Sequence, residues 1–209
     1  MAMVTASPGA APAALPAPSG DAISGGRTRG LTVFGVLLFL AAEAMALGAI
    51  VATYLAVKSG SPRWPPKGVR LGIYLPLTVS ITALMSYASA RWALFAVRRN
   101  DQRNAAIALG LTTVFAIAMV NAEWYALGRR GLGVAKSAYG SLYATLVGFH
   151  ILHVLVAIPI LLVVAGRTVA GHFRVDDHDP VRAASLLWQF GNLTWLVVAV
   201  VLYVASKYK

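Results

Sequence analysis

Five long apolar runs, separated by short polar segments, account for most of the chain. Each run is long enough to cross the roughly 30 Å hydrocarbon core of a bilayer, which takes about 20 helical residues. Backbone amides in lipid must bond within their own segment, so each run is predicted to be an α-helix. The pattern therefore predicts an all-α fold, an integral membrane bundle of five transmembrane helices at about 31–57, 71–97, 105–127, 137–166 and 183–206.

The segments outside these runs favour turns, interfaces or disorder. The first residues are rich in Ala, Pro, Gly and Ser without helical periodicity, so we expect a disordered tail over 1–30 and a membrane domain over 31–209. In the first connection, Trp64 suits the membrane interface and the two prolines after it forbid a helix. Pro180 is typical of the first turn of a helix and indicates where the last one begins.

Composition and charge agree with a membrane protein and exclude other classes. Only 12% of the 209 residues are charged, against about 25% in soluble domains. The net charge of +11 resides in the connecting segments, which indicates topology signals and contacts to lipid headgroups rather than nucleic acid binding. The bases divide equally between the two faces of a five-span bundle, so charge does not predict orientation. The lack of cysteine excludes disulfides, thiolate metal sites and thioether-linked haem.

Polar side chains inside the runs are the candidates for function, because an ionisable group there costs about 2.5 kcal/mol or more without a partner. His150 and His153 share an inward-facing stripe with Tyr139 and Tyr143, at helical spacings of four and three. The buried polar candidates are Glu43, Glu123, His150, His153, Gln189 and Asn192. Aromatic residues expected to anchor the chain at interfaces or lipid are Trp64, Trp124, Tyr139, Tyr143, Trp188 and Trp195.

Approximate depths along the helices suggest which polar groups meet. Glu43 and His150 are both expected near mid-membrane, so a Glu43–His150 contact is permitted. A cluster of His153 with Gln189 or Asn192 is permitted in the same way, and Glu123 lies close enough to the end of its run to reach the interface. A proton relay through Glu43 and a merely structural, protonated Glu43 both remain open.

Ligation of haem or copper by the two histidines is disfavoured. A bis-histidine haem in a bundle needs one His on each of two facing helices, and a metal needs a further intramembrane ligand. The acidic segment from His172 to Asp179 is expected to be a solvated loop rather than a surface metal site. No nucleophile–base set or phosphate loop is present, so no catalytic, cofactor or metal site of the chain's own is expected.

The fourth run carries a family resemblance. It contains SAYGSLYATLVGFHILHVLVAI, which resembles the signature of subunit III of the haem–copper oxidases, where small and aromatic residues lead into Gly-x-His-x-x-His-Val. Agreement in order and spacing continues in LLFLAAEAMALGAIVATYLAV with its acid Glu43, in WPPKGVRLGIYLPLTVSI, in MVNAEWYAL with its acid Glu123, and in SLLWQFGNLTWLVVAVVLYV. The resemblance covers about 31–206 and fits the short, five-helix bacterial form.

This resemblance implies an accessory, non-catalytic subunit of a respiratory oxidase that passes electrons from cytochrome c to oxygen. It further implies a bundle with a lipid-filled cleft, packed against the catalytic subunit I and other respiratory subunits, which supports proton uptake and protects that subunit during turnover. Haem and copper would lie in the partners, with structural phospholipids bound here. The family places the chain in the bacterial cell membrane, with a cytoplasmic N-terminus and an outside C-terminus.

Two departures from the family pattern keep alternatives open. The last helix of the family usually reads Trp-His-Phe-x-Asp, whereas this chain has Gln189 and Asn192 at the two ionisable positions. Ala42 replaces the usual Ser before the buried acid. An accessory subunit of a quinol oxidase or of a nitric oxide reductase is the alternative within the family, although the Trp-Pro-Pro segment favours cytochrome c oxidase. A small haem-binding membrane cytochrome is the alternative from another class.

Overall fold

The structure is a computed structural model that describes residues 30–69, 71–129, 137–173 and 178–205. The predicted disordered tail lies outside the described residues except for Gly30. Over the described residues the fold is all-α, which confirms the predicted class. The helices are α2 (Leu31–Ser59), α3 (Tyr74–Arg98), α4 (Gln102–Arg129), α5 (Ala138–Val169) and α6 (Asp179–Ala199), and a short π-helix η1 (Val200–Val204) continues α6.

Four of these helices are long and apolar enough to cross a membrane, namely α2, α4, α5 and α6 with its continuation η1. The fifth, α3, has 25 residues, but hydroxyl side chains recur along it and lower its hydropathy. The observed helix boundaries differ from the predicted ones by a few residues. The largest shift is at α6, which begins at Asp179, with Pro180 in its first turn, rather than at 183.

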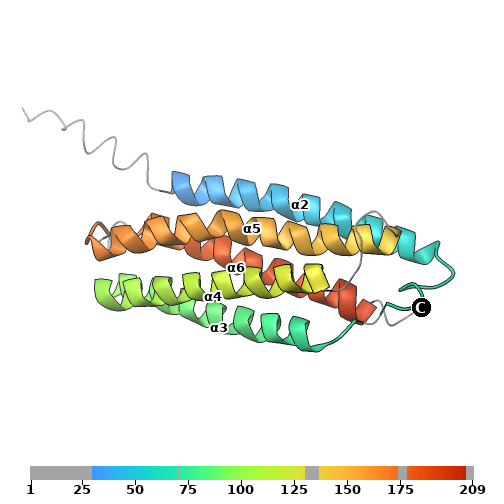
Figure 1. Cartoon of the computed structure of the whole chain (residues 1–209). Coiled ribbons are helices and arrows are strands. Elements are labelled where there is room, and N and C mark those ends of the chain that lie inside the picture. The colour runs from blue at the N-terminus through green and yellow to red at the C-terminus, as the bar shows by residue number, and fades with distance from the viewer. Residues whose placement is uncertain (1–29, 70, 130–136, 174–177, 206–209) are drawn as a thin grey trace, which may run out of the picture.

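The helices form a bundle in which α2 lies at one side, along α5, while α3 and α4 lie at the other (Figure 1). α6 contacts α2, α3 and α5, and α5 contacts α2, α4 and α6, so these two helices together occupy the centre. α2 and α6 run parallel, because polar contacts join both pairs of ends. The backbone N–H of Gly30 donates to Asp179 Oδ2 over 2.6 Å, and Lys58 Nζ donates to the carbonyl oxygen of Ala205 at the other end.

Small residues bring α3 and α4 close together. Alanines at 83, 90 and 93 on α3 and at 105, 108 and 116 on α4 are buried, and small side chains allow helix backbones to approach in a membrane bundle. Hydroxyls join the same two helices. The Ser89 hydroxyl donates to the carbonyl of Ala108 over 2.8 Å and lies 3.1 Å from the hydroxyl of Thr112. This half of the bundle is the framework against which α5 is placed.

α2 is the helix least embedded in the bundle. Its buried side chains are Val33, Leu40, Leu47 and Tyr54, at a regular spacing of seven. A repeat of seven produces a narrow seam along one side of a helix. Glu43 falls on this seam between Leu40 and Leu47, so it turns towards α5 and α6 even though most of the helix is exposed.

Candidate functional site

The predicted stripe on α5 faces the interior of the bundle. Its members Tyr139, Tyr143, Leu146, His150, His153 and Ala157 are all at most 2% exposed. Helical spacing alone therefore predicted the inward orientation of both histidines correctly. Tyr139 and Tyr143 were predicted to anchor the chain at the interface or in lipid. They lie inside the bundle instead.

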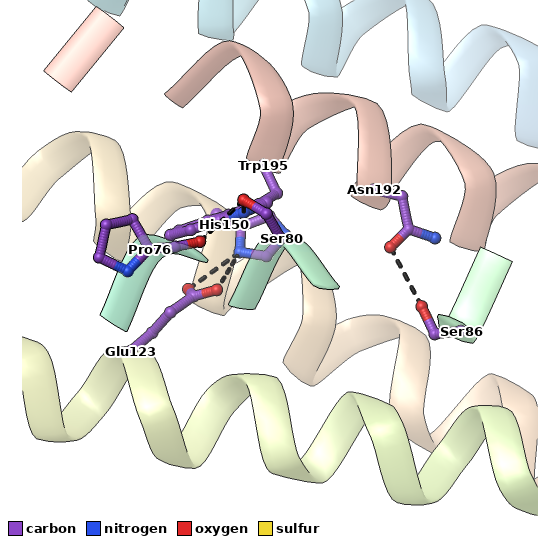
Figure 2. Close-up of polar contacts among 7 residues, drawn as sticks. All are labelled: Pro76, Ser80, Ser86, Glu123, His150, Asn192 and Trp195. Atoms are coloured by element: carbon purple, nitrogen blue, oxygen red, sulfur yellow. Dashed lines mark hydrogen bonds and ion pairs between the residues drawn. The ribbon is translucent and has the colours of Figure 1, made fainter. Parts of the chain in front are cut away.

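His150 forms a sealed pair with Glu123 of α4. Its Nδ1 lies 2.9 Å from Glu123 Oε2 and 2.8 Å from Oε1, and the two side chains are 0% and 2% exposed. Figure 2 shows the carboxyl group reaching up from α4 towards the ring. Glu123 therefore does not reach the interface, as its place near the end of a run suggested, but is enclosed between helices.

His153 forms a second pair, with Glu43 of α2. Its Nδ1 lies 2.8 Å from Glu43 Oε2, and its Nε2 lies 3.1 Å from the carbonyl oxygen of Leu187 on α6. The His153 side chain is 1% exposed and that of Glu43 is 15% exposed. This pair consequently joins three helices and opens slightly at the α2 side of the bundle.

The contact between Glu43 and His150 that helix depth permits does not form, and helix geometry gives the reason. Residues three apart on an α-helix differ by about 60° around its axis, since 3.6 residues make a turn. The two imidazoles therefore diverge, one towards α4 and the other towards α2 and α6. Depth along the helices permits the contact between Glu43 and His150, but the rotation of α5 directs His150 to Glu123 and His153 to Glu43.

Hydrogen-bond chemistry fixes the proton content of the His153 pair. A carbonyl oxygen only accepts, so the Nε2 facing Leu187 must carry a hydrogen. A neutral ring then presents an unprotonated Nδ1, which requires a protonated Glu43; a charged ring requires an ionised Glu43. In both cases one proton lies between Nδ1 and Oε2, and the pair is neutral overall. A pair that is neutral overall avoids the free-energy cost of placing an uncompensated charge in the membrane interior.

The other nitrogen of His150 has no such acceptor. Among the described residues, Nε2 of His150 has no hydrogen-bond partner. The imidazole instead lies against the indole of Trp195, with ring centroids 5.4 Å apart. Trp195 is held in turn by Ser80 Oγ, which accepts from its Nε1 over 3.0 Å, while Ser80 donates to the carbonyl of Pro76 (Figure 2).

Gln189 and Asn192 do not form the cluster with His153 that helix depth permits. Gln189 Nε2 donates to Ser185 Oγ on its own helix over 2.8 Å. Asn192 Oδ1 accepts from the hydroxyl of Ser86 on α3 over 3.2 Å, and Figure 2 shows this contact well separated from the His150 pair. The two amides therefore link α6 internally and to α3, on the side away from His153.

Gly191 is the residue on α6 that sequence reasoning missed. A Cβ at this position would lie 2.7 Å from Cδ2 and from Nε2 of His153, so only glycine leaves room for the ring. The neighbouring Phe190 packs its ring 5.8 Å from the same imidazole. The available signal was a glycine in the middle of an apolar helix, which indicates close approach by a neighbour.

The remaining aromatic candidates divide between the interior and the surface. Trp188 is 1% exposed and donates from Nε1 to Ser86 Oγ over 3.2 Å, and Trp195 is also buried. Trp64, in the first connection, donates from Nε1 to the hydroxyl of Tyr54 on α2 over 2.9 Å. Of the six predicted anchors, Trp124 is the one that is largely exposed, at 69%.

The arrangement of these groups suits proton exchange and hydrogen bonding better than metal ligation. No three His, Asp or Glu side chains of the described residues gather at one point. Both ring nitrogens of His153 are engaged, so a metal at His153 would have to displace Glu43 or the Leu187 carbonyl. The acidic segment between α5 and α6 is only partly described, since 174–177 lie outside the described residues.

Comparison with known proteins identifies relatives along nearly the whole chain. The family model described as cytochrome c oxidase subunit III matches residues 23–207. A cytochrome c oxidase subunit 3 from Synechocystis sp. is 31% identical over 175 residues, which cover 83% of this chain and 75% of the relative. The same subunit from Thermostichus vulcanus is 24% identical, over 84% of this chain and 88% of its own. The Arabidopsis thaliana subunit is 27% identical over 81% of this chain.

Proposed function

Because the chain belongs to the cytochrome c oxidase subunit III family, we propose that it is the accessory, non-catalytic subunit of a respiratory oxidase that passes electrons from cytochrome c to oxygen. In this function it stabilises the catalytic subunit I and supports its proton uptake. The observation that supports its role in proton uptake is the Glu43–His153 pair, whose Nδ1 and Oε2 lie 2.8 Å apart and whose carboxyl side chain is 15% exposed at the α2 side of the bundle.

The proposed arrangement in the membrane has five spans. α3 packs along α4 and α6, both of which are apolar enough to cross, and its 25 residues extend for about 37 Å. A helix of that length beside two spanning helices crosses with them. The cytoplasmic N-terminus and outside C-terminus follow from the resemblance to bacterial members of the family, and the location is the bacterial cell membrane.

Haem and copper belong, in this proposal, to partner subunits, and the chain binds structural phospholipids. The location of haem and copper in partner subunits is supported by the two buried imidazoles, each of which faces a carboxyl group through Nδ1. This arrangement serves hydrogen bonding between helices.

The binding of phospholipids is supported by a groove of about 280 Å³ between α3 and α6, lined mainly by apolar side chains such as Leu84, Leu193 and Leu196. An acyl chain has the shape and polarity for such a groove.

The two pairs have different parts in the proposed function. The Glu123–His150 pair is sealed from the surface, so it serves as a fixed hydrogen bond between α4 and α5. The Glu43–His153 pair has 15% of its carboxyl side chain exposed, so a proton can enter or leave at the α2 side. A group that exchanges protons close to a catalytic partner helps to keep that partner supplied.

Isolation of the native complex tests this function. The chain, tagged and extracted in mild detergent, is expected to co-purify with haem-containing subunits that oxidise reduced cytochrome c. Oxidation of quinol instead, or reduction of nitric oxide, would indicate one of the other oxidase types. If the separated chain shows a stoichiometric Soret band that His150→Ala removes, the chain is a haem-binding cytochrome and the accessory function is refuted.

A further inference from the structure

Asn121 of α4 carries an amide that faces outwards from the helix bundle. Asn121 of α4 is exposed, and neither its amide nitrogen nor its amide oxygen forms a hydrogen bond within the described part of the chain. It lies eight residues before Arg129, the last residue of α4, or about 12 Å along the axis. A 30 Å hydrocarbon core centred on this 42 Å helix would begin about 6 Å from the end, so Asn121 falls within lipid depth.

Several threonine side chains on the outside of the bundle satisfy their hydroxyl groups within their own helix. Exposed hydroxyls on the spanning helices donate to a carbonyl one turn earlier on their own helix, as do those of Thr53, Thr78, Thr82 and Thr145. A hydroxyl has a single hydrogen and is satisfied in this way. The Asn121 amide has two donors and an acceptor, and in lipid these require a partner from outside the chain.

The surroundings of Asn121 form a groove between α4 and α5. This groove has a volume of about 400 Å³ and is lined by Ile117, Val120, Asn121, Trp124, Leu155 and Ile158. Trp124, one turn from Asn121, is 69% exposed beside it. The groove thus combines an apolar floor, a large aromatic side chain and a hydrogen-bonding amide.

A second unsatisfied group lies at the same groove. Pro159 is inside α5 and has no N–H, so the carbonyl of Leu155, four residues earlier, lacks its usual helical donor. Leu155 lines the groove and is 50% exposed. The carbonyl that lacks its helical donor thus belongs to a residue that lines the groove.

We infer that the α4–α5 groove around Asn121 is the docking surface for a membrane-spanning helix of a companion oxidase subunit, one that carries a hydrogen-bonding side chain. Lipid tails offer neither a donor nor an acceptor to Asn121 and Leu155, whereas an amide or hydroxyl on a neighbouring helix offers both. The groove between two parallel ridges of side chains is the shape that a third helix fills. This inference rests on the proposed function, which supplies the companion subunits.

Photo-crosslinking in native membranes tests the inference. The chain has no cysteine, so Asn121→Cys carries a thiol-linked photo-crosslinker at a single position. We expect capture of one spanning subunit that also co-purifies with the chain. Met45→Cys, on α2 and 78% exposed, is the matched control; capture of the same subunit in equal yield from Met45 would indicate random collision and overturn the inference.

A second experiment uses a substitution that removes only the amide of Asn121. Asn121→Leu is expected to leave the complex about three- to tenfold faster in detergent than the unmodified chain, the range for one hydrogen bond between membrane helices, while Asn121→Gln restores retention. Equal retention of the Leu variant, or a crosslinked dimer of this chain, overturns the docking surface. If haem subunits still co-purify, the proposed function survives that result; if they never co-purify, both fail.

Discussion

The imidazole of His153 lies directly against the backbone of Gly191, so closely that a Cβ on Gly191 would be 2.7 Å from the ring. The contact sets the position of the ring between Glu43 and the Leu187 carbonyl. A glycine on the last helix thereby controls a hydrogen bond between two other helices. This relationship leads to the first prediction.

Gly191→Ala is expected to destabilise the assembled chain by about 1–3 kcal/mol, the usual effect of adding a methyl group to a filled core. The ring of His153 must move, which lengthens its bonds to Glu43 and Leu187. Thermal unfolding of the complex measures the effect. Gly148→Ala on α5 is the control, since a Cβ there meets nothing within 4 Å. Equal behaviour of the two variants would show that the contact has no energetic role.

Glu43→Gln is expected to preserve assembly and initial oxidase activity while shortening the working life of the complex. The glutamine amide can donate to Nδ1 of His153, so the link between α2 and α5 remains, but no proton is exchanged. Loss of activity per turnover measures the effect. Glu43→Leu, which removes the hydrogen bond as well, is expected to weaken assembly too. Unchanged inactivation in the Gln variant would mean that Glu43 is purely structural.

Glu123→Ala is expected to destabilise the chain by about 3–5 kcal/mol, because it leaves His150 buried without its partner. The double variant Glu123→Leu with His150→Phe removes both polar groups and should recover part of the loss. Thermal stability of the unmodified chain, Glu123→Leu, His150→Phe and the double variant gives the coupling between the two residues. Additive losses would contradict the sealed pair.

Asp101 gives the N-terminus of α4 a dependence on pH. The backbone N–H of Asn104 donates to Asp101 Oδ1 and the Asn104 amide to Oδ2; the backbone bond is the larger cause, and both lower the pKa of the Asp101 carboxyl. Its stabilisation is therefore present above the ordinary value of about 3.9 and is lost as pH falls through the lowered pKa. Hydrogen exchange in the first turn of α4 should accelerate at acid pH, and Asp101→Ala should remove that dependence.

The sequence predicted the class of fold and the orientation of the α5 stripe, because hydrophobic length and helical periodicity are local properties. It did not predict which acid meets which histidine. That choice depends on how α2 and α4 are placed around α5, and rotation by a single residue would change it. The role of Gly191 was missed for the same reason, since its neighbour is 38 positions away in the chain. The face that a helix buries follows from its own sequence, whereas the choice of neighbouring helices depends on packing.

α2 is joined to the rest of the bundle by polar contacts at three levels: Gly30 at one end, Glu43 in the middle and Lys58 at the other end. Between them its apolar side chains meet either protein or lipid with similar free energy, because hydrocarbon tails resemble the side chains they replace. Sliding or tilting of α2 is therefore opposed chiefly by these few directional bonds. The middle one is the hydrogen bond between Glu43 and His153, so the position of the whole helix depends on a contact formed by a single side chain at its centre.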